Sequence, residues 1–354
     1  MKPNINHVRF DALDGLRGLA AIAVMLCHFT QFFGQNWFKN AGAAVDLFFV
    51  LSGLVIVHSY GAKIVHGMTF VKFLLVRFVR LAPLNIMAVV ISCMTMWLMH
   101  AALVKNYAIS PTILLKAAFL QSIFIPFDNP FSWPYGNYGA SAGIFPLNLP
   151  AWSLFYEMLA YGVCFFYIAI TKKLPGYIFG LLCFGVFFWT TWQLKKISPA
   201  WESGQFTSGT IRVMGSFFIG ALIYKLPLIR SPLTTLVAII SLFLTFYFLA
   251  VGDATTIILN VFLIIPILIW AVRSIVITGL LKGVCSFLGF VSFPLYILHI
   301  PVVTLLLHQR DFINGYSVSA RLPVAIAVTL MVVLITGYLD IKIRKFITNR
   351  YLSD

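Results

Sequence analysis

Two ionisable residues, Arg17 and His28, interrupt the first apolar segment of the chain, LDGLRGLAAIAVMLCHFTQFF. Their eleven-residue separation is almost three turns of an α-helix, so both side chains leave nearly the same face, about 16 Å apart along the axis. A neutral imidazole can accept a proton at physiological pH, and charged groups at membrane depth usually face a protein interior or a water-filled cavity. The spacing therefore favours a polar path with His28 as a proton acceptor. A buried histidine that bonds to a neighbouring helix is an equal alternative.

A pair of arginines, Arg77 and Arg80, stands in RFVRLAP before the third apolar segment. Residues three apart lie on one face of a helix, and the planar guanidinium fork binds two phosphate oxygens at once. The pair is therefore a candidate phosphate site between the second and third spans. An anchor for lipid headgroups explains the same two residues equally well.

Acidic residues stand near the start of two other apolar segments. Glu157 follows in PAWSLFYE, with Tyr161 on the same helix face, and Asp46 follows in GAAVDLFFVLSGLVIVH. Together with Arg212 of a later segment and with His28, they are expected at similar depth in the outer half of the membrane. A convergent set of titratable groups is a candidate catalytic site, with Asp46 or Glu157 as partner of the histidine. The alternative is an acid–arginine pair that only locks helices together.

One polar stripe runs along the segment SFPLYILHIP, where Ser292, Tyr296 and His299 are spaced as i, i+4 and i+7. They are candidates for the substrate side of a site. Hydrogen bonding between membrane helices is the competing explanation.

Aromatic residues are frequent around the segment 127–151, which is also rich in Pro, Gly and Asn and is expected to be an outer loop. Trp152, together with Trp133, Tyr135 and Tyr138, could stack against a sugar. An ordinary aromatic belt at the membrane interface is the alternative.

The elements that must position these residues are membrane helices. Of 354 residues, 61% are hydrophobic and 10% are charged, far from the composition of soluble proteins. The sequence predicts an all-α polytopic membrane protein. Ten spans are expected, at about 14–33, 43–62, 83–104, 152–171, 176–194, 208–225, 232–251, 254–274, 286–308 and 322–343.

The apolar piece 111–126 is short for a span and suits an interfacial or re-entrant helix. If it does not cross, most of the 25 Lys and Arg residues gather on one side, which predicts that both termini are cytoplasmic. Residues 10–13 then form a cytoplasmic lead-in. We expect a single domain over residues 1–354, without a cleaved signal peptide and without an appended soluble domain.

The charge and the cysteines exclude other classes of protein. A net charge of +15 is explained by basic cytoplasmic loops, so we expect no nucleic acid partner. The five cysteines show no paired spacing, so we expect neither a disulfide framework nor a metal site.

The ordered set of LDGLRGLAAIAVMLCH, VDLFFVLSGLVI, RFVRLAP, WSLFYE and YILHIP resembles the acyltransferase-3 family of integral-membrane O-acyltransferases. The resemblance covers essentially the whole chain. It implies ten spans and transfer of an acyl group, usually acetyl, from cytoplasmic acyl-coenzyme A (acyl-CoA) to a hydroxyl on a sugar or another cell-surface acceptor. Arg17, Arg77 and Arg80 match family positions that would contact the donor.

The resemblance also implies a catalytic set. His28 matches the histidine of the family's Arg-x10-His pair, while Asp46 and Glu157 match its two acidic positions. The chain departs from the family pattern in three places. Leu84 stands where an aromatic residue is frequent, no acidic or proline residue closely follows Arg212, and Pro294 replaces a serine of the late motif.

The resemblance thus implies a membrane-bound O-acyltransferase of a bacterial inner membrane, with acetyl-CoA as donor and a glycan, glycolipid or lipid-linked sugar as acceptor. Membrane lipids are further partners, and the oligomeric state is left open. The rival class is a proton-coupled transporter or flippase with an intramembrane His, Asp and Glu relay. A cytoplasmic arginine pair for a nucleotide distinguishes the enzyme from the transporter.

Overall fold

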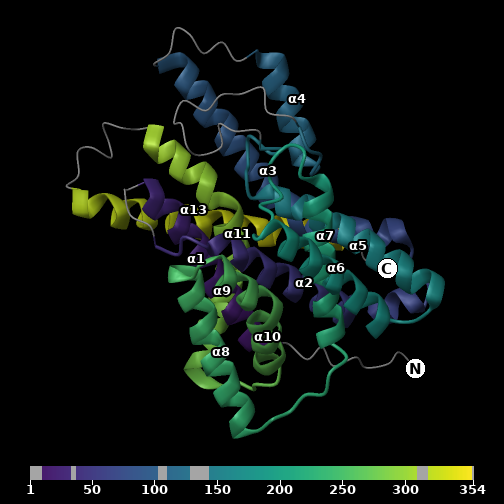
Figure 1. Ribbon diagram of the computed structural model, residues 1–354. Coiled ribbons are helices and arrows are strands. Elements are labelled where there is room, and N and C mark those ends of the chain that lie inside the picture. Colours follow the sequence, from purple (N-terminus) through teal and green to yellow (C-terminus); the bar gives the residue numbers. More distant parts are fainter. Residues whose placement is uncertain (1–9, 33–36, 103–109, 128–142, 309–317, 353–354) are drawn as a thin grey trace.

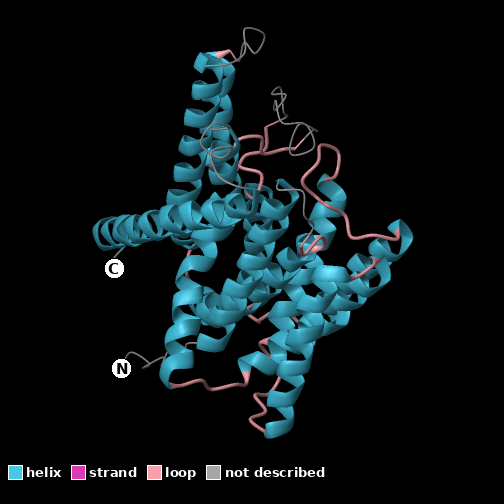
Figure 2. Cartoon of the chain, turned by 90° about the vertical axis from the view of Figure 1, so that its left-hand side faces the viewer, coloured by secondary structure: helices cyan, strands magenta, loops and turns pink. Residues whose placement is uncertain are grey.

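The computed structural model describes residues 10–32, 37–102, 110–127, 143–308 and 318–352, and this part of the chain is helical (Figures 1 and 2). The elements are α1 (Asp11–Phe32), η1 (Ala41–Ala43), α2 (Ala44–Val65), α3 (Phe70–Ala102), α4 (Pro111–Ser122), α5 (Ala151–Thr171), α6 (Tyr177–Leu194), α7 (Phe206–Ile223), α8 (Pro232–Val251), α9 (Ala254–Leu259), η2 (Asn260–Ile264), α10 (Ile265–Arg273), α11 (Gly279–His308), α13 (Val318–Ile347) and η3 (Thr348–Leu352).

Ten helical segments of the described residues are long and apolar enough to cross a membrane, which confirms the predicted number. One of them is the continuous run of α9, η2 and α10. Large side chains on the outward faces of the bundle are apolar and more than half exposed, for example Leu182, Trp189, Ile239 and Phe243. Apolar surface of this extent needs a non-aqueous surrounding.

Helix α4 has 12 residues and is about 18 Å long, too short for a hydrocarbon core of about 30 Å. It packs beside α3 (Figure 1). A buried amide chain holds it there: the Asn85 side chain donates to the carbonyl of Gln121 at 2.7 Å, and Asn148 donates to Asn85 at 2.9 Å. Segment 111–126 therefore supports the bundle without crossing it.

Three helix boundaries differ from those predicted. Helix α3 begins at Phe70, so Arg77 and Arg80 lie inside a continuous helix and not between two spans. Helix α11 begins at Gly279, and the expected lead-in 10–13 mostly forms the first turn of α1. The hydropathy pattern missed these turns because charged and small residues lower it, although the backbone hydrogen bonds of the helix continue through them. Most of the expected outer loop 127–151, with Trp133, Tyr135 and Tyr138, lies outside the described residues.

Glycines bring two helix pairs into backbone contact. A Cβ atom at Gly53 of α2 would lie 1.8 Å from the carbonyl oxygen of Phe217 in α7, and one at Gly220 would lie 1.9 Å from the carbonyl oxygen of Val50. Helices α1 and α11 meet in the same way, because a Cβ atom at Gly18 would lie 2.5 Å from Leu288. Close approach at small residues is a common mode of helix packing in membranes.

The α2–α7 contact yields a prediction for Gly53→Ala. The added methyl group must push two backbones apart, so we expect a loss of about 1–3 kcal/mol of stability. The matched control is Gly185→Ala in α6, where an added Cβ meets nothing within 4 Å and where alanine is intrinsically better than glycine in a helix. Thermal unfolding in detergent measures both. Equal midpoints for the two variants would contradict the proposed backbone contact.

Candidate active site

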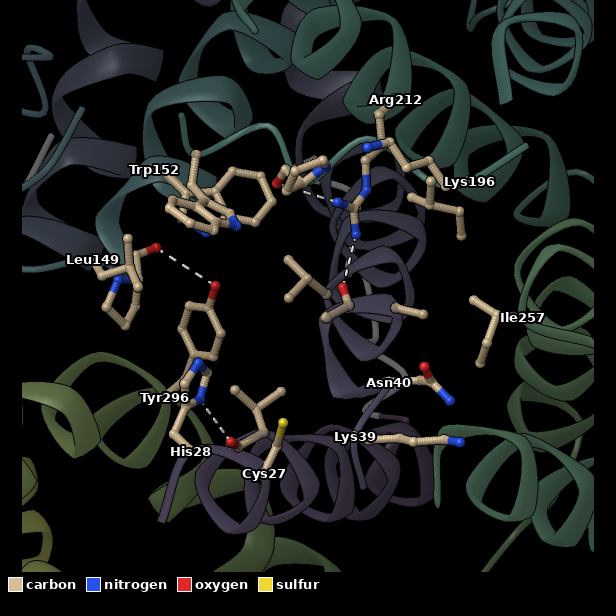
Figure 3. A pocket seen from close by; sticks show the side chains of 18 of the residues that line it. Cys27, His28, Lys39, Asn40, Leu149, Trp152, Lys196, Arg212, Ile257 and Tyr296 are labelled. Atoms are coloured by element: carbon tan, nitrogen blue, oxygen red, sulfur yellow. Dashed lines mark hydrogen bonds between the residues drawn. The ribbon is translucent and has the colours of Figure 1, made fainter. Parts of the chain in front are cut away.

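Two cavities lie one after the other along α1. The first, the arginine cavity, has a volume of about 170 Å³ and is lined by Arg17, Arg77, Arg80, Glu157 and Ser292 among others. The second, the histidine cavity, has a volume of about 590 Å³, and its lining side chains surround the space shown in Figure 3. It contains the candidate residues His28, Trp152, Arg212, Tyr296 and His299.

Tyr296 lines both cavities. Its hydroxyl donates to Ser153 Oγ at 2.9 Å, which joins α11 to the start of α5. Its ring packs 5.2 Å from that of Phe48. Any chain-like group that passes from one cavity to the other must pass this tyrosine.

Arg17 is held at the wall of the arginine cavity by α1 and α11 together. Its Nε donates to Ser292 Oγ at 3.0 Å, and its Nη2 donates to Asp14 at 3.1 Å and to the carbonyl of Gly289 at 3.3 Å. Ser292 of the predicted polar stripe therefore orients Arg17.

Glu157 lies with the arginines and not with the histidine. Ser52 and Tyr161 both donate to Glu157 Oε1, and Arg77 donates to the hydroxyl of Tyr161 at 2.6 Å. The carboxylate and the Arg77 guanidinium thus share one tyrosine. Arg80 lines the same cavity but makes no hydrogen bond or ion pair with any residue of the described chain.

His28 contacts His299, the last member of the polar stripe. His299 Nε2 lies 3.2 Å from His28 Nδ1, and the ring centroids are 5.0 Å apart. His299 Nδ1 lies 2.8 Å from the carbonyl oxygen of Tyr296, and His28 Nδ1 lies 2.9 Å from that of Val24.

These contacts fix the neutral tautomers of both rings. A carbonyl oxygen only accepts hydrogen bonds, so Nδ1 carries the proton in each ring. His28 Nδ1–H then donates to the lone pair of His299 Nε2, and the lone pair of His28 is on Nε2. The arrangement suits a proton acceptor that is oriented by a second imidazole.

Asp46 and Arg212 form a buried ion pair in the wall of the histidine cavity, 2.7 Å apart and 0% and 3% exposed at the side chain. Ser216 also donates to Asp46, at 2.9 Å. The five N–H donors of a guanidinium all have acceptors here, because Arg212 also donates to the carbonyls of Ser198 at 2.6 Å and Gly42 at 2.7 Å. The pair therefore joins α2, α7, η1 and the loop after α6 at the cavity wall.

The structure divides the set that the sequence predicted to converge. Arg212 and His28 line one cavity, Glu157 lines the other, and Asp46 is bound behind the wall by Arg212. Helical depth alone could not separate them, because the direction of each side chain depends on which helices are neighbours. Trp152 is placed at the histidine cavity, with its ring 5.5 Å from the Arg212 guanidinium.

Some residues of the site had a weak signal in the sequence. Ser52 and Tyr161 are the partners of Glu157, and only Tyr161 was recognisable, from its spacing. In the part of the chain that the structure describes, no three His, Cys, Asp or Glu side chains gather as a metal site.

Comparisons with known proteins identify the family of the chain. The acyltransferase-3 family model, described as "Acyltransferase domain", matches residues 10–340. A relative named "Protein 2 in picA locus", from Rhizobium radiobacter, is 36% identical over 169 residues, which are 44% of this chain and 80% of that protein. No solved structure matches the chain.

The buried ion pair predicts unequal effects of single and double substitution. Arg212→Gln leaves the Asp46 carboxylate buried without its partner, and Asp46→Asn does the same to Arg212, so each should cost about 3–5 kcal/mol. The double variant should cost less than the sum of the two. Thermal unfolding of the four proteins measures the coupling.

The control for this series is Lys282→Gln, which breaks a long contact of the exposed Lys282 side chain with Asp11 at 3.6 Å. An ion pair with a solvent-exposed partner contributes at most about 1 kcal/mol. Additive losses from Asp46→Asn and Arg212→Gln would show that the two side chains do not act as a pair.

Proposed function

Because this chain belongs to the acyltransferase-3 family of membrane acyltransferases, we propose that it moves an acyl group, acetyl in the simplest case, from acyl-CoA to a hydroxyl of a glycan, glycolipid or lipid-linked sugar. The observation that carries this proposal is the pair of cavities along α1. One presents guanidinium groups and the other presents an oriented imidazole, and both open on Tyr296.

The arginine cavity supports binding of the donor. CoA carries phosphates at one end and a thioester at the other, joined by a long, thin arm. Arg77 and Arg80 suit the phosphates, and Arg17 lies where the arm would pass toward Tyr296. A volume of about 170 Å³ accommodates a narrow arm.

His28 is the proposed general base. A hydroxyl is a poor nucleophile until a base within hydrogen-bond reach takes its proton. We propose that the acceptor oxygen attacks the thioester carbonyl carbon while its proton passes to His28 Nε2. The carbon–sulfur bond then breaks, and the CoA thiolate takes up that proton. Direct attack is favoured over an acyl-histidine intermediate, since no second nucleophile is needed.

His299 would act as a positioning residue in this reaction. Its Nε2 lone pair accepts the Nδ1–H of His28 and can stabilise the imidazolium that forms. This is the role that the sequence suggested for Asp46 or Glu157. Neither carboxylate hydrogen-bonds to a histidine of the described chain.

The other candidate residues would act around the reacting atoms. Trp152 offers an apolar face to a sugar in the histidine cavity, and Arg212 with Asp46 fixes that wall. Glu157 would hold Tyr161 and Arg77 in place for the donor. Tyr296 and Ser292 would line the passage of the arm.

The direction of the reaction across the membrane follows from the charge distribution. With cytoplasmic termini, as the positive-inside rule favours, most of the 25 Lys and Arg residues lie on the cytoplasmic side, and we propose a cytoplasmic donor and an outward-facing acceptor. A bacterial inner membrane fits this arrangement. The name of the picA-locus relative gives no substrate, so the acceptor class is proposed from the family resemblance and from the lining of the histidine cavity.

The donor site is tested by replacing Arg77 and Arg80 together with Gln. Two charge-assisted contacts are lost, each worth about 1.5–3 kcal/mol, so acetyl-CoA affinity should fall by about 100-fold or more. Lysine at both positions should restore it only in part, because the bidentate geometry is absent. Calorimetric titration of the purified protein gives the dissociation constants.

Lys72→Gln is the control for this experiment, because it removes one positive charge from the same helix outside the cavity. Its affinity should equal that of the wild type. Unchanged affinity in the double arginine variant would assign the pair to lipid anchoring and would favour the transporter class.

The base is tested by His28→Ala. Transfer to the native acceptor in membranes should fall about 10²–10⁴-fold, while acetyl-CoA affinity stays unchanged because the nucleotide contacts are elsewhere. His66→Ala, which removes an exposed histidine at the end of α2, should keep the wild-type rate. A His28→Ala rate above about a tenth of that of the wild type, at matched protein level, would rule out His28 as the base.

A further inference from the structure

Arg80 carries the uncompensated charge of the arginine cavity. Each acidic side chain around it serves a different arginine. Asp14 pairs with Arg17 at 3.1 Å, and Glu157 is linked to Arg77 through Tyr161. In the described chain Arg80 makes no hydrogen bond or ion pair of its own, although the charge of Asp340 acts on it. Its N–H donors are therefore available to a ligand, in contrast to those of Arg212.

A fourth arginine, Arg344, comes to Arg80 from the last helix, α13. Helices α3 and α13 pack together, and the charge of Arg344 acts on Arg80 more strongly than those of Arg17 and Arg77. Asp340 lies one turn earlier, 3% exposed, and holds Arg344 at 2.6 Å. The Arg344 Nε is buried and has no partner in the described chain.

Two guanidinium groups whose charges repel each other suit a doubly charged anion. Carboxylates carry one charge, whereas a phosphate monoester carries up to two and offers three acceptor oxygens. A site of this kind is stabilised when the anion binds, because the ligand replaces the repulsion of the two cations by two attractions.

The donor carries one group of this kind. From its adenosine end, CoA carries a 3′-phosphate monoester on the ribose, then the diphosphate, then the arm and the thioester. Arg77 and Arg80 line the arginine cavity, and Arg344 lies outside that lining. The ribose 3′-phosphate is therefore the doubly charged group of the donor that suits Arg80 together with Arg344.

We propose that Arg344 and Arg80 form a phosphate-monoester site that binds the ribose 3′-phosphate of CoA, with Asp340 orienting Arg344. This inference rests on the proposed function and makes it more specific. It assigns to the last helix a part in donor selection, and it predicts that the protein distinguishes CoA from its 3′-dephospho form. A phospholipid headgroup offers similar phosphate chemistry, so the experiment must separate the two.

The test compares acetyl-CoA with acetyl-3′-dephospho-CoA by calorimetric titration of detergent-purified protein without added lipid. For the wild type, loss of the 3′-phosphate should weaken binding about 10–100-fold, since a hydrogen bond to a charged group contributes about 1.5–3 kcal/mol. Arg344→Gln should weaken acetyl-CoA binding by a similar factor and leave the affinity for the dephospho form unchanged. The control Lys342→Gln removes an exposed cation of the same helix that packs over Tyr338, and it should change neither affinity.

Several outcomes would overturn the proposal. Equal affinity of the wild type for the two donors would contradict it. An equal loss of both affinities in Arg344→Gln would contradict it as well. A difference between wild type and Arg344→Gln that arises only after addition of phosphatidylglycerol would assign Arg344 to a lipid headgroup. If Arg344→Gln does not fold, Arg344→Lys and Arg80→Gln provide the same comparison. Failure of the wild type to bind either donor would count against the proposed function itself.

Discussion

The close packing of α1 against α11 is the constraint on which both cavities depend. Gly15 and Gly18 of α1 face Cys285 and Leu288 of α11 at distances that leave no room for a Cβ atom. Within a bilayer no hydrophobic effect drives helices together, so such contacts rely on close van der Waals packing and on polar groups between the helices. Here the polar contacts lie in the same α1–α11 interface as the glycines. Arg17 meets Ser292 on one side of Tyr296, and His28 meets His299 on the other. One helix pair therefore aligns the guanidinium and the imidazole along a single path.

Counting hydrogen bonds separates arginines that support the fold from arginines that can bind a ligand. Arg212 is buried, and each of its donors has a protein acceptor, so a substrate could engage it only at the cost of a bond already made. Arg80 has no such acceptor in the described chain. Both are arginines that interrupt apolar segments of the sequence. The structure separates them by their neighbours, and an unpaired charge inside an apolar segment is too costly to persist without a function.

The sequence predicted the helical architecture and several of the charged and polar residues that line the two cavities, because both depend on local signals. Long apolar runs determine the number of spans, and an eleven-residue spacing places Arg17 and His28 on one helix face regardless of the rest of the fold. The partners of these residues could not be predicted in the same way. Glu157 was expected near His28 because both were placed at a similar depth in the membrane. Successive residues of a helix are rotated by about 100°, so depth alone does not tell which neighbouring helix a side chain contacts. Arg344 gave no signal, since an Asp and an Arg one turn apart near a terminus are typical of an exposed helix end.

The position of Tyr296 between the cavities resolves a conflict inherent in the proposed reaction. A base that activates a sugar hydroxyl will also activate water, and a continuous wet channel would let water reach the thioester and would leak ions across the membrane. An aromatic side chain tethered to Ser153 and packed on Phe48 keeps the two polar spaces apart when no arm is present. The inserted arm would itself fill the passage beside Tyr296. Water would then be excluded from the thioester carbon while the acceptor attacks that carbon. The narrowness of the arginine cavity and the greater width of the histidine cavity are then two requirements of one reaction. The thin arm of the donor needs a narrow passage, and the sugar ring of the acceptor needs a wider cavity.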